Sequence, residues 1–299
     1  MRRRSFLGLT LVLALASGLQ SSASPMPPPS FINATDWQGE GEFFGGFSSI
    51  AVTPDGSGFL SLSDHGAWVR GTFARDAQDR LTGIFSGPLT PLLGPNGAPL
   101  PQGSTDSEGL ALAPDGSFYV SFEGPARVRH YASPGSASGN LPSPREFKSM
   151  KHNSSLESLC IGSDGSLYTL PEISGGGPAR PFPVFRYRNG KWDNFGTVPR
   201  GDEFETVDCS IGPDGRFYLL ERAFYGLGGF ASRLKRYDMG AKGLTGEIVL
   251  FQTAPGTFDD LEGLSVWRDH LGNLRATTVS DDNFSMFFVS QIVEFELPD

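Results

Sequence analysis

The sequence has none of the signatures of the common helical enzyme classes. No long stretch carries apolar residues at the 3.6-residue helical period, and the 39 Gly and 23 Pro among its 299 residues disfavour long helices. The sequence lacks the Gly-x-Ser-x-Gly nucleophile elbow, the His-Glu-x-x-His zinc motif and a phosphate-binding loop. Aromatic residues, at 12%, are well represented, as in β proteins. We therefore predict an all-β chain.

Positive charge is also scarce. Charged residues make up only 19% of the chain, and 33 acidic residues against 24 basic ones give a net charge of −9. Such a surface repels nucleic acid and anionic membranes. We expect no nucleic-acid partner, no membrane span and a monomeric protein.

The first 23 residues are predicted to be an export signal. Arg2, Arg3 and Arg4 precede an apolar run that is too short to span a bilayer comfortably, and a small-residue cleavage site follows at 21–23. The stretch "RRSFL" resembles the twin-arginine signal of bacteria, although an ordinary secretory signal would also fit. The mature protein is expected in the periplasm or outside the cell.

One pattern recurs five times along the mature chain. Two apolar stretches flank a tight turn, over residues 47–64, 105–124, 154–172, 204–221 and 260–281, the last with a looser turn. The Asp-Gly turns begin at Asp55, Asp115, Asp164 and Asp214, at intervals of 60, 49 and 50 residues. Gly tolerates positive φ and Asp bonds its own backbone, so Asp-Gly predicts a hairpin.

Each hairpin is followed by further strand-like sequence, which makes about four strands per repeat, the size of a propeller blade. We predict an all-β β-propeller of five or six blades, formed by residues 37–299 as one domain after an N-terminal extension at 24–36. Residues 37–44 are expected to supply the outer strand of the last blade and close the ring, because closure removes exposed sheet edges.

Acidic residues occupy both ends of these hairpins. A hairpin brings its start and its end to the same rim, so these carboxylates should gather on the rim opposite the Asp-Gly turns. Carboxylates without Cys or His suit a hard cation, and we expect calcium. The candidate metal ligands are Asp64, Glu108, Glu123, Glu157, Asp208, Glu262 and Asp281.

The register within a hairpin stays open at this stage. With a two-residue turn, Glu108 and Glu123 would be direct cross-strand neighbours. With a bulge in the Pro-Asp-Gly turn, they would be diagonal or opposite-face neighbours. Like charges placed so close destabilise a sheet unless they are neutralised. The alternative explanation for each acid is that it is an ordinary polar residue at a blade edge and accepts hydrogen bonds only from backbone N–H groups.

Several of these motifs resemble the phytase-like family, also described as esterase-like activity of phytase. They are Asp106-Ser107-Glu108-Gly109-Leu110, Ser63-Asp64-His65-Gly66, Asp260-Leu261-Glu262-Gly263-Leu264 and Ser280-Asp281-Asp282-Asn283-Phe284. The resemblance covers most of residues 45–297 and implies an exported bacterial propeller that hydrolyses a phosphoric or carboxylic ester with the help of calcium. The fourth repeat departs from the pattern, since Glu205-Thr206-Val207-Asp208 replaces Glu-Gly-Leu.

The hypothesis that follows is a hydrolase of a small-molecule ester. His65 and Glu157 are the candidate catalytic acid or base, although His65 also fits a polar turn residue. Arg127 and Arg129 are candidate substrate ligands, or ordinary outer-strand charges. Two alternatives remain: a non-catalytic propeller that binds a ligand or a cell-surface partner through its acidic rim, and a calcium-dependent lactonase-like hydrolase.

The two cysteines, Cys160 and Cys209, occupy opposite faces of consecutive repeats, so they should face the same interface between blades. An exported protein and an even count favour a disulfide. Packed sheets lie roughly 10 Å apart, whereas a disulfide needs Cα atoms within about 7 Å. We therefore favour two buried free thiols over a bond.

Overall fold

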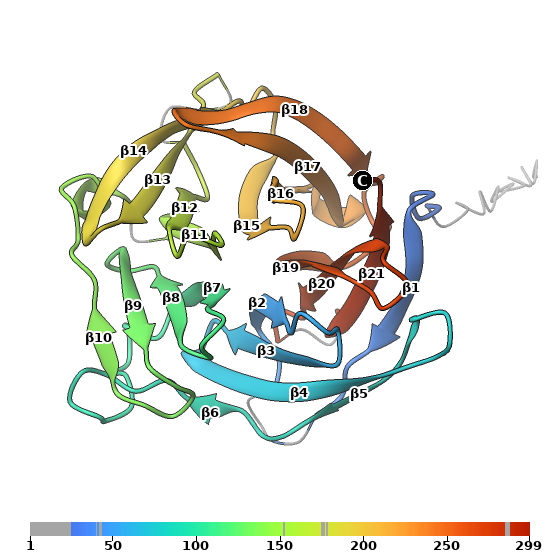
Figure 1. Ribbon diagram of the computed structural model, residues 1–299, viewed down its shortest axis with the longest axis horizontal. Helices are drawn as coiled ribbons and strands as arrows, with labels where there is room; N and C mark the ends of the chain where they lie inside the picture. The colour runs from blue at the N-terminus through green and yellow to red at the C-terminus, as the bar shows by residue number, and fades with distance from the viewer. Residues whose placement is uncertain are drawn as a thin grey trace, which may run out of the picture.

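The computed structural model describes residues 25–39, 41, 44–151, 153–174, 177, 179–284 and 288–299, so the predicted export signal lies outside the described residues. Five antiparallel sheets stand around a central axis, as the all-β propeller prediction requires, and there are five blades (Figure 1). Apart from strands, the described chain holds two short 3-10 helices, η1 (Phe147–Ser149) and η2 (Gly226–Gly228). None of the helices in these ranges is long and apolar enough to cross a membrane.

The strands of each blade follow one another outward from the axis in chain order, except that β1 is the outermost strand of blade 5 (Figure 1). Blade 1 contains β2 (Phe47–Val52), β3 (Gly58–Ser63), β4 (Ala67–Arg75) and β5 (Leu81–Ser86), with the short β6 (Thr90–Pro91) on β4; blade 2 contains β7 (Ser107–Leu112), β8 (Phe118–Phe122), β9 (Arg127–Tyr131) and β10 (Ser138–Asn140).

The remaining blades follow the same order. Blade 3 contains β11 (Leu156–Ile161), β12 (Leu167–Pro171), β13 (Phe182–Arg188) and β14 (Lys191–Val198); blade 4 contains β15 (Glu205–Ile211), β16 (Phe217–Phe224), β17 (Phe230–Gly240) and β18 (Gly243–Gln252); blade 5 contains β19 (Asp260–Arg268), β20 (Leu274–Asp281), β21 (Gln291–Leu297) and β1 (Phe31–Asp36).

An N-terminal strand closes the ring, as expected, but it is β1 at Phe31–Asp36 and not residues 37–44. It pairs with β21, which lies beside it in Figure 1. The stretch after β1 packs into the core instead, where Trp37 stacks on Phe47 at 4.0 Å and meets Phe44 edge-on at 5.3 Å. These aromatic residues fill the core beside blade 1, which explains their strand-like composition.

The Asp-Gly turns form as predicted. Asp55, Asp115 and Asp164 each accept a hydrogen bond from the backbone N–H two residues further on, at 3.0–3.1 Å, and these bonds help to lower the pKa of each carboxyl. In the fifth repeat Asp269 takes this role and accepts from the Leu271 N–H at 3.0 Å. The looser fifth turn is therefore the same structural unit.

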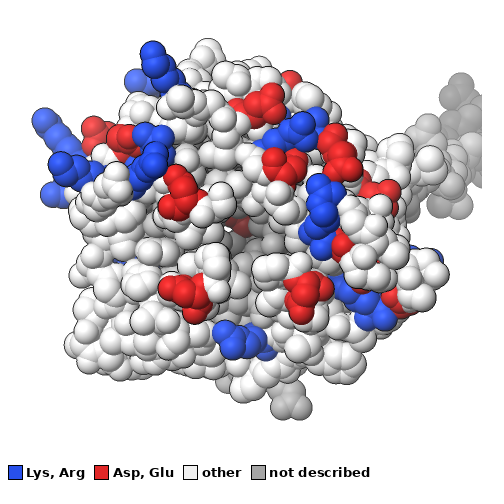
Figure 2. All heavy atoms as spheres, viewed as in Figure 1, with Lys and Arg blue, Asp and Glu red and all other residues white. Residues whose placement is uncertain are grey.

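The core lies between the blades. The larger apolar clusters combine residues of neighbouring blades, such as Leu220 of blade 4 with Leu264 and Phe295 of blade 5. Seen along the axis, the surface carries scattered charged side chains, with several carboxylates spaced around the central hollow (Figure 2).

The two cysteines form a bond that the sequence analysis did not favour. Cys160 on β11 and Cys209 on β15 face the same interface, as expected, but they form a disulfide with Cα atoms 5.6 Å apart. The expected gap of about 10 Å applies to sheets that are packed face to face. Near the axis the blades converge, so their innermost strands come closer than the sheets do further out.

Candidate functional site

A β-bulge lies near the start of every innermost strand. The pairing of β11 with β12 shifts between Leu156 and Ser158, and equivalent shifts occur in the other four blades. The turn at the far end of the hairpin is bulged as well, since in blade 2 the Ala113 N–H bonds the Ser117 carbonyl around Pro-Asp-Gly. A bulge leaves a residue unpaired and re-aims its side chain. The bulge positions near the strand starts are Ser48, Glu108, Glu157, Val207 and Glu262.

The re-aimed acids meet in a cavity of about 240 Å³ at the end of the ring opposite the Asp-Gly turns. The structure brings together six of the seven candidate metal ligands there. We call this cavity the acidic pocket. Its lining is Asp64, Asp106, Glu108, Glu123, Asn153, Ser154, Glu157, Glu172, Arg222, Glu262 and Asp281. Eight carboxylates therefore face a single guanidinium among the described residues.

Burial and crowding shift the pKa values of these acids. Burial raises the pKa of Glu108, Glu157 and Glu262 well above the usual range, and in Glu108 and Glu157 neighbouring carboxylates add to the shift. Burial likewise raises the pKa of Asp64 to about 6 and that of Asp281 to about 7. Ionising all of these groups at neutral pH is therefore costly without additional positive charge.

The pocket offers three places where carboxylate oxygens approach one another within 4.8 Å. The three acidic triads are Asp106–Glu108–Glu123, Glu123–Glu157–Glu172 and Asp260–Glu262–Asp281. Asp260 is only 2% exposed, and its buried Oδ1 atom has no hydrogen-bond partner among the described residues. An all-oxygen donor set with an orphaned buried oxygen fits a hard cation such as Ca²⁺.

The second strand of each hairpin ends on this pocket as well. In each blade, one residue at the end of the second strand pairs with the residue at the start of the innermost strand. In blades 1 to 5, in that order, these residues are Asp64, Glu123, Glu172, Arg222 and Asp281. The fourth repeat of the sequence pattern, residues 204–221, ends on an acid as well, Glu221. Glu221 is instead held by Arg233 at 2.6 Å and Lys235 at 3.3 Å, away from the pocket.

Arg222 is the residue that sequence reasoning missed. In blade 4 Glu205 pairs with Arg222 and Thr206 with Glu221, because the bulge before Asp208 shifts the register by one residue. Counting the hairpin with the same bulge as in the other repeats would have identified Arg222. Its guanidinium binds Asp260 at 2.8 Å, Glu172 at 3.2 Å and the Glu262 carboxylate.

Asp208, the seventh candidate ligand, lies apart from the pocket. It is 1% exposed and accepts hydrogen bonds from the Ser49 hydroxyl at 2.8 Å, the Leu264 N–H at 2.9 Å and the Cys209 N–H at 2.8 Å. Ser49 in turn accepts from the Leu110 N–H at 3.2 Å. Burial raises the pKa of Asp208, and these bonds oppose the shift. This carboxylate links blades 1, 2, 4 and 5 at the axis.

The other candidates occupy different positions. His65 is half exposed at 53%, lies 3.8 Å from Asp64 and stacks on Phe284 with ring centroids 4.3 Å apart. Arg127 donates to the carbonyls of Glu123, Pro125 and Ser104 and lies over the Phe122 ring, with Arg129 nearby. Neither arginine lines the acidic pocket, and both serve the structure of blade 2.

The Ser-Asp-Asp-Asn-Phe segment supports the rim of the pocket. Asp281 lines the cavity, while Asp282 accepts hydrogen bonds from the Gly46 N–H at 3.1 Å and the Ser290 hydroxyl at 2.9 Å. The Asn283 amide donates to Asp260 Oδ2 at 3.3 Å. This segment therefore ties blade 5 to the start of blade 1 and orients two of the acids.

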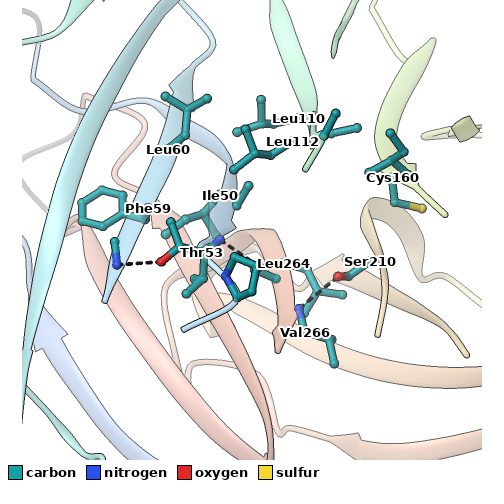
Figure 3. A pocket seen from close by; sticks show the side chains of 18 of the residues that line it. Ile50, Thr53, Phe59, Leu60, Leu110, Leu112, Cys160, Ser210, Leu264 and Val266 are labelled. Carbon is teal, nitrogen blue, oxygen red and sulfur yellow. Dashed lines mark hydrogen bonds between the residues drawn. The ribbon is translucent and has the colours of Figure 1, made fainter. Parts of the chain in front are cut away.

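A second cavity of about 1010 Å³ opens on the turn side of the ring. Its walls are mainly apolar, with Ile50, Leu110 and Leu264 pointing into it, and the Val266 N–H donates to the Ser210 hydroxyl at 2.9 Å (Figure 3). Within the described part of the chain, Arg70 is the only charged residue in its lining. This cavity therefore offers no pair of acid and base among those residues.

Comparison with known proteins adds a family and a fold. A family model described as "Phytase-like: Esterase-like activity of phytase" matches residues 42–284. None of the curated proteins matches the sequence significantly. An α-L-arabinofuranosidase from Podospora anserina is similar in structure, with a TM-score of 0.51 and 14% identity, over 89% of this chain and 95% of that one.

Two further solved structures are similar at 14% identity. An exo-β-1,3-galactanase from Clostridium thermocellum has a TM-score of 0.51, over 80% of this chain and 58% of that one. A gluconolactonase from Xanthomonas campestris has a TM-score of 0.41, over 85% and 89%. At such low identity the likenesses to the arabinofuranosidase and the galactanase support the fold alone.

Proposed function

Because this chain belongs to the phytase-like family, we propose that its acidic pocket is the site of a cation-assisted hydrolysis of a phosphoric or carboxylic ester. One observation carries the proposal: eight carboxylates converge on a cavity whose described lining contains a single guanidinium. Such an excess of buried negative charge is stable only with protons or cations bound. The family's description supports ester hydrolysis as the use of that site.

Calcium is the cation that we propose. The triad Asp106–Glu108–Glu123 would hold it through oxygen atoms alone, which leaves the carboxylate of Glu157 free to act as a base. Bound Ca²⁺ would neutralise an anionic substrate and polarise the ester oxygen. Glu123 uses one oxygen to accept the N–H groups of Ser154 and Ser155, which fixes the other toward the pocket.

Glu157 is the proposed general base. It lies at the bulge of blade 3, it is 7% exposed, and its carboxylate receives no hydrogen bond from the described residues. Burial and the neighbouring Glu108 and Glu172 raise the pKa of this carboxyl, which makes its carboxylate a stronger base than an exposed one. His65, exposed at the mouth beside Asp64, is placed to exchange protons with solvent.

The size of the pocket limits the substrate. A cavity of about 240 Å³ is smaller than the roughly 300–1,000 Å³ of sites that enclose a drug-sized ligand. Only the reacting ester group would enter, while the rest of the substrate stays at the mouth. A phosphate ester, being anionic, requires a bound cation to enter this negative pocket, whereas a neutral carboxylic ester does not.

The test compares p-nitrophenyl phosphate and p-nitrophenyl acetate as substrates of the purified mature protein. We expect hydrolysis of at least one of them to be lost with EDTA and restored by Ca²⁺. Glu157→Gln should lower kcat by about 100-fold or more, the usual contribution of a general base. Glu146→Gln, an exposed acid beside η1, is the matched control and should retain full activity.

The alternative is a binding module without catalysis. It would bind Ca²⁺ but hydrolyse neither substrate, and it would show no activity across a wider panel of phosphate, carboxylic and lactone esters. That outcome would overturn the proposed hydrolysis and leave the cation site in place.

We also propose that the protein works in the periplasm or outside the cell. The Cys160–Cys209 disulfide supports this, because such bonds persist in oxidising compartments. Extracellular calcium sites need only weak affinity, of about 10⁻⁴–10⁻³ M. Fractionation of an expressing bacterium with N-terminal sequencing of the product tests the proposal: a cytoplasmic protein that retains residues 1–23 would contradict it.

A further inference from the structure

The fourth blade breaks the chemical symmetry of the ring at two positions. At the bulge it carries Val207, where blades 2, 3 and 5 carry Glu. At the end of its second strand it carries Arg222, where the other four blades carry an acid. Both changes remove negative charge, and the second adds a positive charge.

The contacts of Arg222 place that charge on one side of the pocket. Nη1 donates to Asp260 Oδ2 at 2.8 Å and to Glu262, and Nη2 donates to Glu172 Oε1 at 3.2 Å. An arginine guanidinium stays protonated over the whole physiological pH range. The guanidinium is therefore a permanent cation that bridges blades 3, 4 and 5.

We propose that Arg222 is a built-in counter-cation that takes the place of a bound cation at the Asp260–Glu262–Asp281 triad. Bound cations are thereby confined to the Asp106–Glu108–Glu123 triad of blade 2, none of whose members Arg222 binds. This inference rests on the proposed function only in that the pocket binds cations. It concerns where and how many cations bind, and not the reaction.

The contacts of Arg222 support this division of the pocket. Arg222 binds two of the three acids in that triad directly, so a divalent ion among the same oxygens would lie against the guanidinium and be repelled. The buried Oδ1 atom of Asp260 nevertheless has no partner among the described residues. This oxygen is therefore available as a ligand for an additional cation once Arg222 is replaced.

The experiment counts Ca²⁺ in Arg222→Gln. Wild type and variant are treated with chelator and dialysed against a series of Ca²⁺ concentrations. The number of Ca²⁺ ions bound per chain is then measured by inductively coupled plasma mass spectrometry. We expect Arg222→Gln to bind one more Ca²⁺ than wild type. Arg233→Gln is the matched control: Arg233 is another buried arginine of blade 4, paired with Glu221 and Asp202, and its loss should leave the count unchanged.

A folded Arg222→Gln protein that binds no additional Ca²⁺ overturns the inference. If that variant folds only when Ca²⁺ is present, the dependence of its folding on Ca²⁺ confirms that it has gained a bound ion. If it does not fold at all, Arg222→Lys decides: it keeps the charge and should bind as many ions as wild type, and an additional ion would contradict the proposal. A wild-type protein without Ca²⁺ would count against the proposed function alone, because the inference is scored on the difference between variant and wild type.

Discussion

Individual acids in this protein have different roles at nearly identical positions in the sequence pattern. Glu157 and Asp208 both lie just before an Asp-Gly turn, one seven and the other six residues ahead. Glu157 opens on the acidic pocket, whereas Asp208 is enclosed at the axis by hydrogen bonds from other blades. The single-residue difference matters because the seventh residue before the turn is the bulge residue, Glu157 in blade 3 and Val207 in blade 4, whereas Asp208 follows the bulge.

Asp208 should therefore be a stability residue. We predict that Asp208→Ala lowers the free energy of unfolding by about 3 kcal/mol or more, because it leaves several buried donors without an acceptor. Urea denaturation measures the change. Asp238→Ala, an exposed acid on β17, is the control and should stay within about 0.5 kcal/mol of wild type.

The titration of the pocket acids predicts how stability depends on pH in the chelated protein. The pKa values of Asp281 and Glu123 rise to about 7 in the folded state, and that of Asp64 to about 6. The folded state thus holds protons that the unfolded chain has released, so stability is full below about pH 4 for these groups and falls as pH rises toward 7.

Thermal melts of the chelated protein from pH 4 to pH 8 test this prediction, and millimolar Ca²⁺ should abolish the decline. A melting temperature that rises over this range in the chelated protein would contradict it. The comparison with and without Ca²⁺ separates the pocket acids from other titrating groups.

At the scale of elements, β1 closes the ring although it is distant in sequence from its partner. It pairs with β21, and Phe31 packs on Phe295 and Phe258 with ring centroids 6.3 and 5.6 Å apart. Without β1, the edge of β21 would be open to pairing with other chains.

We predict that a mature protein beginning at residue 37 has a lower melting temperature than wild type and aggregates on heating. A protein beginning at residue 29, which keeps β1, is the control and should behave as wild type. Calorimetry and light scattering provide the two measurements. Equal melting of both truncated proteins would show that β1 contributes little to closure.

At the scale of the whole molecule, the disulfide and the proposed cation site both connect to the same ring of blades. The Cys160–Cys209 bond joins blades 3 and 4 and closes a loop of 49 residues in sequence. In the chain-entropy model, such a link stabilises the native state by about 4 kcal/mol. We predict that Cys160→Ala with Cys209→Ala lowers the unfolding free energy by an amount approaching this value, measured in urea.

Chelation provides the second prediction at this scale. A ligand that binds only the native state stabilises it, so EDTA should lower the melting temperature and Ca²⁺ should restore it. Because the acids of the pocket come from blades 1, 2, 3 and 5, the loss should affect the unfolding of the whole ring. An unchanged melting curve would indicate that protons and Arg222 alone balance the carboxylates.

Some properties of this protein follow from its sequence without a structure. The spacing of the Asp-Gly turns, the apolar residues before each turn and the acids at hairpin ends predict a propeller with a carboxylate cluster on one rim. These signals are local and recur in five repeats, so a departure in one repeat does not hide the pattern that the others share. The family resemblance rests on the same repeated motifs and agrees with the family match.

Other properties were decided only by the tertiary structure. The bulges turned Glu108, Glu157 and Glu262 into the acidic pocket, where acids of different blades meet. The convergence of blades at the axis brought Cys160 and Cys209 within bonding distance. Closure by Phe31–Asp36 depended on which segment lay beside β21. Each of these outcomes depends on distances between segments that are remote in the chain, which a local pattern cannot specify.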